Sequence, residues 1–183
     1  MERTNVLGYH ITAMKLSFLN TSDPNAFVSY LGGVFEHSSW VAERAWKKRP
    51  FSDVNSLHAG MMAVVREAAD IEKLTLIRAH PELAGREAVQ GTLTADSSGE
   101  QGRLGFTSLT REEFLQIAEI NRRYREKFGF PCIVALRLHA TRGSVIAEMQ
   151  RGLEQDLDAE IGRALEQIGE ITRGRLEKMV ETV

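Results

Sequence analysis

The sequence predicts an all-α protein, and three observations carry this prediction. Apolar residues recur at three- and four-residue steps in several segments, which is the pattern of a helix with one buried face. Side chains that cap helix N-termini precede these segments, and Gly or Pro follows them. Only residues 131–138 are apolar and β-branched over the length of a strand, and no second convincing strand exists to pair with them. We therefore expect one compact multi-helix domain over residues 1–183, with an extended buried segment near 130–138.

Capping residues and chain breakers place the helices in the first half of the chain. Asp23 precedes Pro24, a pair that suits a helix N-terminus, and Gly32 ends the short helix that they open. The next helices are expected from Val34 to Lys48, over the apolar stripe from Val54 to Ala68, and from a cap at Asp70 to a point before Pro81.

The second half contains one less regular region and three further helices. Residues 85–108 are rich in Gly, Ser, Thr and Asp with weak periodicity, so we expect an ordered or partly helical loop there. Thr110 and Glu113 match a capping box for a helix that Gly129 ends. Two more helices are expected from Ser144 onward, the last over residues 156–179.

Charge and composition exclude several classes of protein. The 183 residues carry 23 Lys and Arg against 25 Asp and Glu, a net charge of −2, so we expect no extended positive surface for a nucleic acid. The single cysteine, Cys132, provides neither an internal disulfide nor a cysteine-based zinc site. No segment approaches the roughly 20 apolar residues of a membrane span. We expect a cytoplasmic protein with no metal, no nucleic acid partner and no membrane partner.

Two positions are candidates for a chemical role, and His80 is the candidate for acid–base work. His80 precedes Pro81, and a residue before proline is disfavoured in helical geometry, so His80 should lie at a helix end that can aim its side chain into a cleft. The alternative is a partly buried histidine with both ring nitrogens satisfied. Glu100 and Gln101 place a carboxylate beside an amide in a Gly/Ser context, and the alternative there is a solvated loop.

A helical projection separates two arginines of the last helix. At about 100° per residue, Arg175 falls about 40° from the centre of the apolar stripe, whereas Arg173 falls about 120° away. We expect Arg175 to point inward, where it either pairs with an internal carboxylate or binds an acidic ligand. The alternative is an arginine whose stem packs while its head reaches solvent at the helix end.

We expect structural roles for two further residues. Asn121 lies on the apolar face of its helix and is expected to be a satisfied core amide that could cap the segment after Pro131. Cys132 has no activating histidine nearby in the sequence and is expected to be inert packing.

Three segments of the sequence together resemble one enzyme family. They are FEHSSWVA at 35–42, HPELAG at 80–85 and KFGFP at 127–131, and the likeness extends through Glu100-Gln101 and Arg175-Leu176. The chain is similar over nearly its whole length to the 2-oxo-4-hydroxy-4-carboxy-5-ureidoimidazoline (OHCU) decarboxylases. These enzymes complete the conversion of urate to (S)-allantoin.

The resemblance implies an all-helical, cofactor-free lyase that acts on a small-molecule substrate, OHCU, and forms a homodimer. It assigns His80 as the catalytic histidine and Glu100 as the active-site glutamate. The residues that it places at the substrate are Pro81, Ser97, Ser98, Gly99, Gln101, Cys132, Ile133, Val134, Ala135, Leu136 and Arg175.

These assignments give each group an expected task. His80 would be the general acid–base group, with Glu100 orienting it or holding the ureido N–H groups. Arg175 and the backbone amides near 133–135 would hold carbonyl or carboxylate oxygens, and Gln101 the ureido group. The chain departs from the family's usual residues at Ser39, Phe106 and Cys132, of which only Cys132 borders the expected pocket.

Two other functions remain open on the sequence. A non-catalytic helical module could bind an acidic ureide through an inward Arg175. A His/Glu-dependent ureide hydrolase would release ammonia or a carboxylate instead of CO₂.

Overall fold

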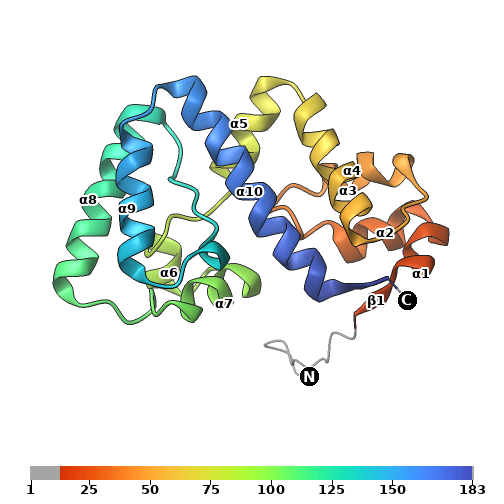
Figure 1. The fold of residues 1–183 in the computed structure, drawn as a ribbon, viewed down its shortest axis with the longest axis horizontal. Helices are drawn as coiled ribbons and strands as arrows, with labels where there is room; N and C mark the ends of the chain where they lie inside the picture. The colour runs from red at the N-terminus through yellow and green to blue at the C-terminus, as the bar shows by residue number, and fades with distance from the viewer. Residues whose placement is uncertain (1–12, 183) are drawn as a thin grey trace. The chain divides into compact units, whose positions relative to one another are not determined.

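The computed structural model describes residues 13–182, and helices account for most of them, as predicted (Figure 1). The strands in this part of the chain are β1 (Met14–Lys15) and β2 (Val180–Glu181), which pair in parallel with Met14 opposite Val180. No sequence pattern predicts this pair, because a strand of two residues is too short to show alternation. The all-α class is confirmed. No helix in the described part has the length and apolarity needed to cross a membrane.

Contacts group the chain into two compact units. The first runs to Leu76 and includes the segment from Thr172 onward, and the second is Ile77–Ile171. Helices α5 (Asp70–Arg78) and α10 (Leu157–Met179) each contribute residues to both units. The assignment of residues 1–183 to one domain stays a prediction.

The first unit is built from short helices around an aliphatic and aromatic core. Asp23 caps the second helix by accepting a hydrogen bond from the Ala26 N–H at 3.0 Å, as predicted. Phe27, Leu57 and Met61 are completely buried in this core. Its helices before α5 are α1 (Leu16–Thr21), α2 (Pro24–Leu31), α3 (Trp40–Ala45), the 3₁₀ turn η1 (Trp46–Lys48) and α4 (Val54–Glu67).

Two local expectations for this unit are wrong. The helix expected over 34–48 begins only at Trp40, because the preceding turn buries side chains from successive positions, whereas a helix buries one face. His37 in that turn has a positive φ of 46°, which ends any helical path. Asp70 is the first residue of α5 and not its cap; the Glu72 carboxylate instead accepts from the Ala69 N–H at 3.0 Å.

The second unit contains the longest helices and the predicted extended segment. The capping box is present: Thr110 Oγ1 accepts from the Glu113 N–H, and Glu113 Oε2 accepts from the Thr110 N–H. Residues 131–135 have no regular structure and are mostly buried, as predicted, whereas Leu138 is exposed. The helices of this unit before α10 are α6 (Arg86–Gln90), α7 (Ala95–Arg103), α8 (Arg111–Phe128), the 3₁₀ turn η2 (Leu136–Leu138) and α9 (Arg142–Leu153).

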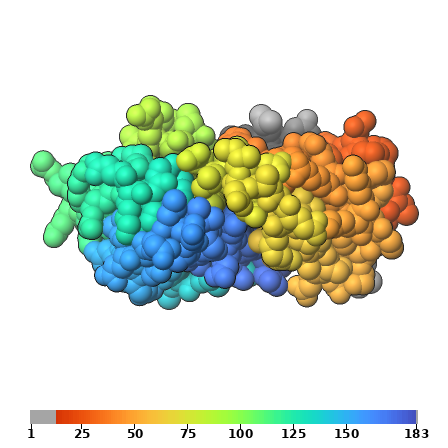
Figure 2. Space-filling model, turned by 90° about the horizontal axis from the view of Figure 1, so that it is seen from above, coloured from red at the N-terminus to blue at the C-terminus, as the bar shows by residue number. Residues whose placement is uncertain are grey.

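The region 85–108 is partly helical, as expected, because it holds α6 and α7. The chain around α6 protrudes from the surface in Figure 2, where it is yellow-green, and it leaves Val89 72% exposed. Helices α8 and α9 pack side by side (Figure 1).

A buried polar cluster lies where α8, α9 and α10 meet. The Tyr124 hydroxyl donates to Glu160 Oε1 at 3.2 Å, and Arg163 donates to the same carboxylate. Burial raises the pKa of Tyr124, so its hydroxyl stays protonated and can act as this donor. Gly152 leaves the room for the hydroxyl, since a Cβ there would overlap Tyr124 Oη.

This close approach predicts a large difference between two glycine substitutions. Gly152→Ala should destabilise the protein by about 1–3 kcal/mol, because the added methyl must displace a buried tyrosine. Gly162→Ala in α10 meets no atom within 4 Å and should stabilise by about 0.5–1 kcal/mol through helix propensity. Denaturant unfolding of both variants measures the difference, and equal shifts would contradict this packing.

Candidate functional site

His80 lies just beyond the end of α5, as the proline after it predicts. Its backbone N–H donates to the Ile77 carbonyl at 3.2 Å, closing the last turn. The side chain is 6% exposed. Pro81 turns the chain away from the helix axis, so His80 heads the loop 81–85.

The loop after His80 is a tight turn. The Gly85 N–H donates to the Glu82 carbonyl at 3.2 Å, and Ala84 has a positive φ of 49°. A Cβ on Gly85 would lie 2.5 Å from Glu82 Cβ, closer than two carbons can approach. The turn therefore requires glycine at position 85.

Two buried side-chain amides hold the backbone of this loop. Gln101 from α7 accepts from the Ala84 N–H at 3.0 Å and donates to the Glu82 carbonyl at 3.4 Å. Asn121 from α8 donates to the Leu83 carbonyl at 2.9 Å. Three consecutive residues of the loop are thus bonded to side chains of other helices.

The expectation for Asn121 is only partly met. Its Nδ2 is satisfied, but by Leu83 and not by the segment after Pro131. Its Oδ1 is buried and has no hydrogen-bond partner among residues 13–182. The loop is also tied to α8 by an ion pair between Arg125 and Glu82.

Helix α7 connects the loop to the extended segment. While Gln101 bonds the loop, Arg103 donates to the carbonyls of Leu136 and, at 3.2 Å, His139. Helix α7 is therefore bonded both to the loop after His80 and to the end of the extended segment.

The individual predicted residues differ in how accessible they are. Ser97 and Gln101 are buried, Glu100 is half-buried, and Ser98 and Gly99 are exposed. Pro81 is half-buried. Both ends of the Gln101 amide bond the loop, so the donor that this side chain keeps for a ligand is the second N–H of Nε2.

The backbone amides of the extended segment are not equivalent. The Ala135 N–H donates to Gln167 Oε1 at 2.8 Å, so this amide already has an acceptor. The structure gives the amides of Ile133 and Val134 no acceptor within residues 13–182. These two amides are donors that the segment can offer to a ligand.

Cys132 has the properties of a packing residue. Its side chain is buried, and burial raises the pKa of the thiol to about 12, which keeps it protonated at neutral pH. Arg163 donates to its sulfur at 3.6 Å. A thiol in this state is a poor nucleophile.

Arg175 points inward, as the helical projection predicts, and belongs to the first unit. It is 2% exposed, whereas Arg173 is half-buried. Of the two partners considered, the structure provides the internal carboxylate: Arg175 Nη1 donates to Glu36 Oε2 at 2.8 Å. The sequence pattern assigned no role to Glu36, and the available signal was a charged residue directly after the apolar pair Val34-Phe35.

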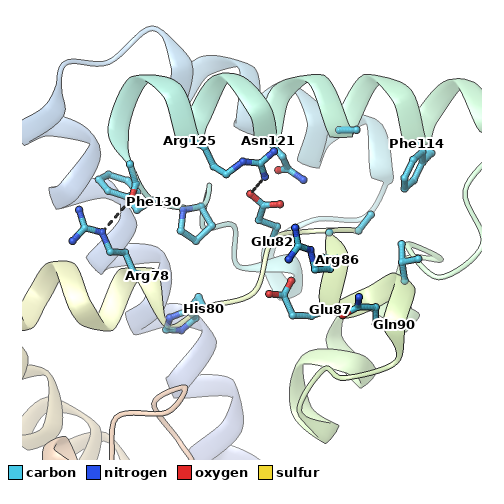
Figure 3. A pocket seen from close by; sticks show the side chains of 16 residues that line it. Arg78, His80, Glu82, Arg86, Glu87, Gln90, Phe114, Asn121, Arg125 and Phe130 are labelled. Atoms are coloured by element: carbon cyan, nitrogen blue, oxygen red, sulfur yellow. Dashed lines mark hydrogen bonds and ion pairs between the residues drawn. The ribbon is translucent and has the colours of Figure 1, made fainter.

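A cavity of about 680 Å³ lies within the second unit (Figure 3). Arginines, glutamates and two phenylalanines line much of it, with His80 on the side opposite Phe114. His80 is the one residue of the predicted set that contributes to its lining. Other lining residues include Arg78, Glu82, Arg86, Asn121, Arg125 and Phe130.

The described residues hold no group of three or more His, Cys, Asp or Glu side chains arranged to bind a metal ion. The absence of a metal in the reaction stays a prediction.

Comparison with known proteins decides the family. The family model described as OHCU decarboxylase matches residues 20–177. This chain belongs to the OHCU decarboxylase family.

Relatives in this OHCU decarboxylase family match along most of the chain. The decarboxylase of Mus musculus is 36% identical over 163 residues, which cover 89% of this chain and 91% of the mouse protein. The Haloferax volcanii decarboxylase is 35% identical, with 89% of this chain and 94% of the relative covered. The uric acid degradation bifunctional protein of Bacillus sp. (strain TB-90) is 37% identical, and this chain spans 32% of its length.

Solved structures support the same fold. An (S)-allantoin synthase structure matches with a TM-score of 0.71 at 28% identity, covering 91% of this chain and 54% of that one. An OHCU decarboxylase structure determined in the presence of (S)-allantoin matches with a TM-score of 0.63 at 20% identity, covering 79% and 93%. The second likeness is evidence for the fold alone.

The loop bonds predict that one amide of α8 contributes far more to stability than another. Asn121→Ala removes the donor to the buried Leu83 carbonyl and should cost about 1–3 kcal/mol. Gln116→Ala, an exposed amide on the same helix, should change stability by less than about 0.5 kcal/mol. The free energy of unfolding in urea measures both, and similar losses would show that Asn121 does not hold the loop.

Proposed function

We propose that this chain catalyses the decarboxylation of OHCU to (S)-allantoin and CO₂, the last step of urate degradation to allantoin. The observation that carries the proposal is His80 at the head of a loop that Gln101 and Asn121 immobilise, in a chain of the OHCU decarboxylase family. A fixed imidazole is what proton transfer at a defined substrate atom requires.

The chemistry needs no metal or organic cofactor. The carboxylate of OHCU is attached to a ring carbon that also bears a hydroxyl and adjoins a ring C=N bond. When the carbon–carboxylate bond breaks and CO₂ leaves, its electron pair forms a C=C bond to the ring carbon that bears the ureido group. The electron pair of the C=N bond moves onto the ring nitrogen, which takes up a proton. The hydroxyl then loses its proton to become a carbonyl, and a proton is added to the carbon that bears the ureido group. The protein must therefore orient the ring, move protons and stabilise charge.

His80 is assigned the proton transfers at the ring hydroxyl or the imine. Glu100 is assigned the orientation of His80 or the binding of the ureido N–H groups, since a carboxylate accepts such donors. Delivery of the last proton to one face of the ring sets the (S) configuration.

The remaining residues bind the substrate. Arg175 and the amides of Ile133 and Val134 are assigned the carbonyl or carboxylate oxygens, because all are donors. Pro81, residues 97–99 and the side chains of 132–136 form the walls. Gln101 holds the loop, and its second Nε2–H is assigned to the ureido group. The Ala135 amide also remains part of the proposal, at the cost of its bond to Gln167.

The cellular setting inferred from the sequence belongs to the same proposal. We infer a homodimer in the cytoplasm with the small molecule OHCU as its partner, and neither nucleic acid nor membrane.

Replacing His80 tests the catalytic assignment. His80→Asn should lower the rate of (S)-allantoin formation by about 10²–10⁴, the usual contribution of a general acid–base group, while the protein stays folded. His37→Asn is a matched control, because His37 is exposed and asparagine tolerates its positive φ. Circular dichroism at the allantoin bands gives the rate, and thermal unfolding of the same preparations gives the stability.

If His80 is only a structural residue, His80→Asn will melt at a lower temperature yet retain nearly the wild-type rate when folded. That result would exclude His80 as the proton-transfer group.

A second substitution separates the substrate site from the cavity of Figure 3. Arg86 lines that cavity but has no place in the proposed substrate contacts. Arg86→Ala should therefore leave kcat/KM for OHCU within about twofold of wild type, whereas loss of a charge-assisted substrate contact costs about tenfold or more. A tenfold loss of kcat/KM in Arg86→Ala would show that the substrate binds in the cavity.

A further inference from the structure

The most deeply buried ion pair among the described residues that involves a proposed substrate contact is Arg175 with Glu36. Both side chains are 2% exposed, and Nη1 of Arg175 lies 2.8 Å from Oε2 of Glu36. The same Nη1 also donates to the Val34 carbonyl at 3.2 Å. Two acceptors from one short turn thus converge on one nitrogen of the guanidinium.

Stability alone is a weak reason for such a pair. Removing two charges from water is costly, and apolar side chains of similar volume often stabilise a core as well or better. A buried guanidinium is useful where its planar array of donors must meet an anion or a carbonyl in a fixed orientation. The pair is therefore better explained as a means of presenting Arg175 than as a means of holding the unit together.

The backbone of residues 34–38 is shaped to make this contact. The Ser38 N–H donates to the Phe35 carbonyl at 3.0 Å. His37, the residue before Ser38, has a positive φ of 46°. A left-handed conformation is unfavourable for a residue with a side chain. This turn replaces the helix expected there, and it directs both the Glu36 carboxylate and the Val34 carbonyl to Arg175.

We propose that Glu36 is a positioning residue for the decarboxylation, acting through Arg175; this inference rests on the proposed function. The Glu36 carboxylate and the Val34 carbonyl both accept from Nη1 of Arg175, so the orientation of the guanidinium plane is set before substrate binds. An arginine that is already ordered loses less conformational entropy when it takes up a substrate oxygen. Without Glu36 the guanidinium would still carry its charge but would lose its charged acceptor, and its orientation would be less well defined.

A double-mutant cycle tests whether Glu36 acts through Arg175. Glu36→Gln keeps the shape and an acceptor oxygen but removes the charge that holds the guanidinium. We expect it to lower kcat/KM for OHCU by about fivefold or more, mostly through KM, in the wild-type background. In the Arg175→Gln background, which by itself should lose about tenfold or more, Glu36→Gln should change kcat/KM by less than twofold.

Two control substitutions belong to the cycle. Arg173→Ala removes a neighbouring charge of α10, and Glu43→Gln removes an exposed carboxylate of α3; both should keep kcat/KM within about twofold of wild type. All rates are measured at a temperature well below the unfolding midpoint of every variant. The neutral double variant leaves no unpaired charge in the core, so it keeps the comparison valid if either single variant is unstable.

Three results would overturn the inference. A folded Glu36→Gln protein with wild-type kcat/KM would make the pair structural only. Equal losses from Glu36→Gln in both backgrounds would show that Glu36 does not act through Arg175. A wild-type protein that forms no (S)-allantoin would overturn the proposed function, and this inference with it.

Discussion

The site depends first on the hydrogen bonds that hold the loop after His80. Within this turn the Gly85 N–H bonds the Glu82 carbonyl, but the buried Ala84 N–H and Leu83 carbonyl need partners from outside it. The amides of Gln101 and Asn121 satisfy those groups from two helices. In this way α7 and α8, which the chain reaches later, fix the position of a histidine at the end of α5.

The helices are arranged so that these amides can be buried. The capping box at Thr110 sets where α8 begins, and that start determines which face carries Asn121. On the same helix Tyr124 packs against the gap left by Gly152, which brings α9 close. The bond between Asn121 and the loop therefore comes from a helix, α8, that is held both at its capped N-terminus and by the packing of Tyr124.

Much of this could be predicted from the sequence, for reasons that are local. Capping at Asp23 and Thr110, helix termination at Gly129 and the inward direction of Arg175 follow from short-range rules. The turn at 34–39 could not be predicted in that way. Its residues are apolar enough for a helix. The contact that favours the turn, between Glu36 and Arg175, joins residues that are far apart in the sequence.

The candidate site shows the same division. Residue types and the family resemblance predict which segments form the site, and α7 bonds two of these segments, the loop after His80 and the end of the extended segment. The bonding of individual groups was not predictable, because Gln101 and Ala135 each found a partner within the protein instead of remaining open. Such choices depend on distances between elements, which a sequence pattern does not contain.

The proposed role of each site residue depends on one reaction, the conversion of OHCU to a single enantiomer of allantoin with loss of CO₂. The most direct measurement adds the purified protein to freshly oxidised and hydrolysed urate, and follows circular dichroism together with released CO₂ and ammonia. We predict formation of (S)-allantoin faster than the spontaneous reaction, with one CO₂ for each allantoin and no ammonia. Racemic allantoin at the spontaneous rate, or ammonia in place of CO₂, would contradict it.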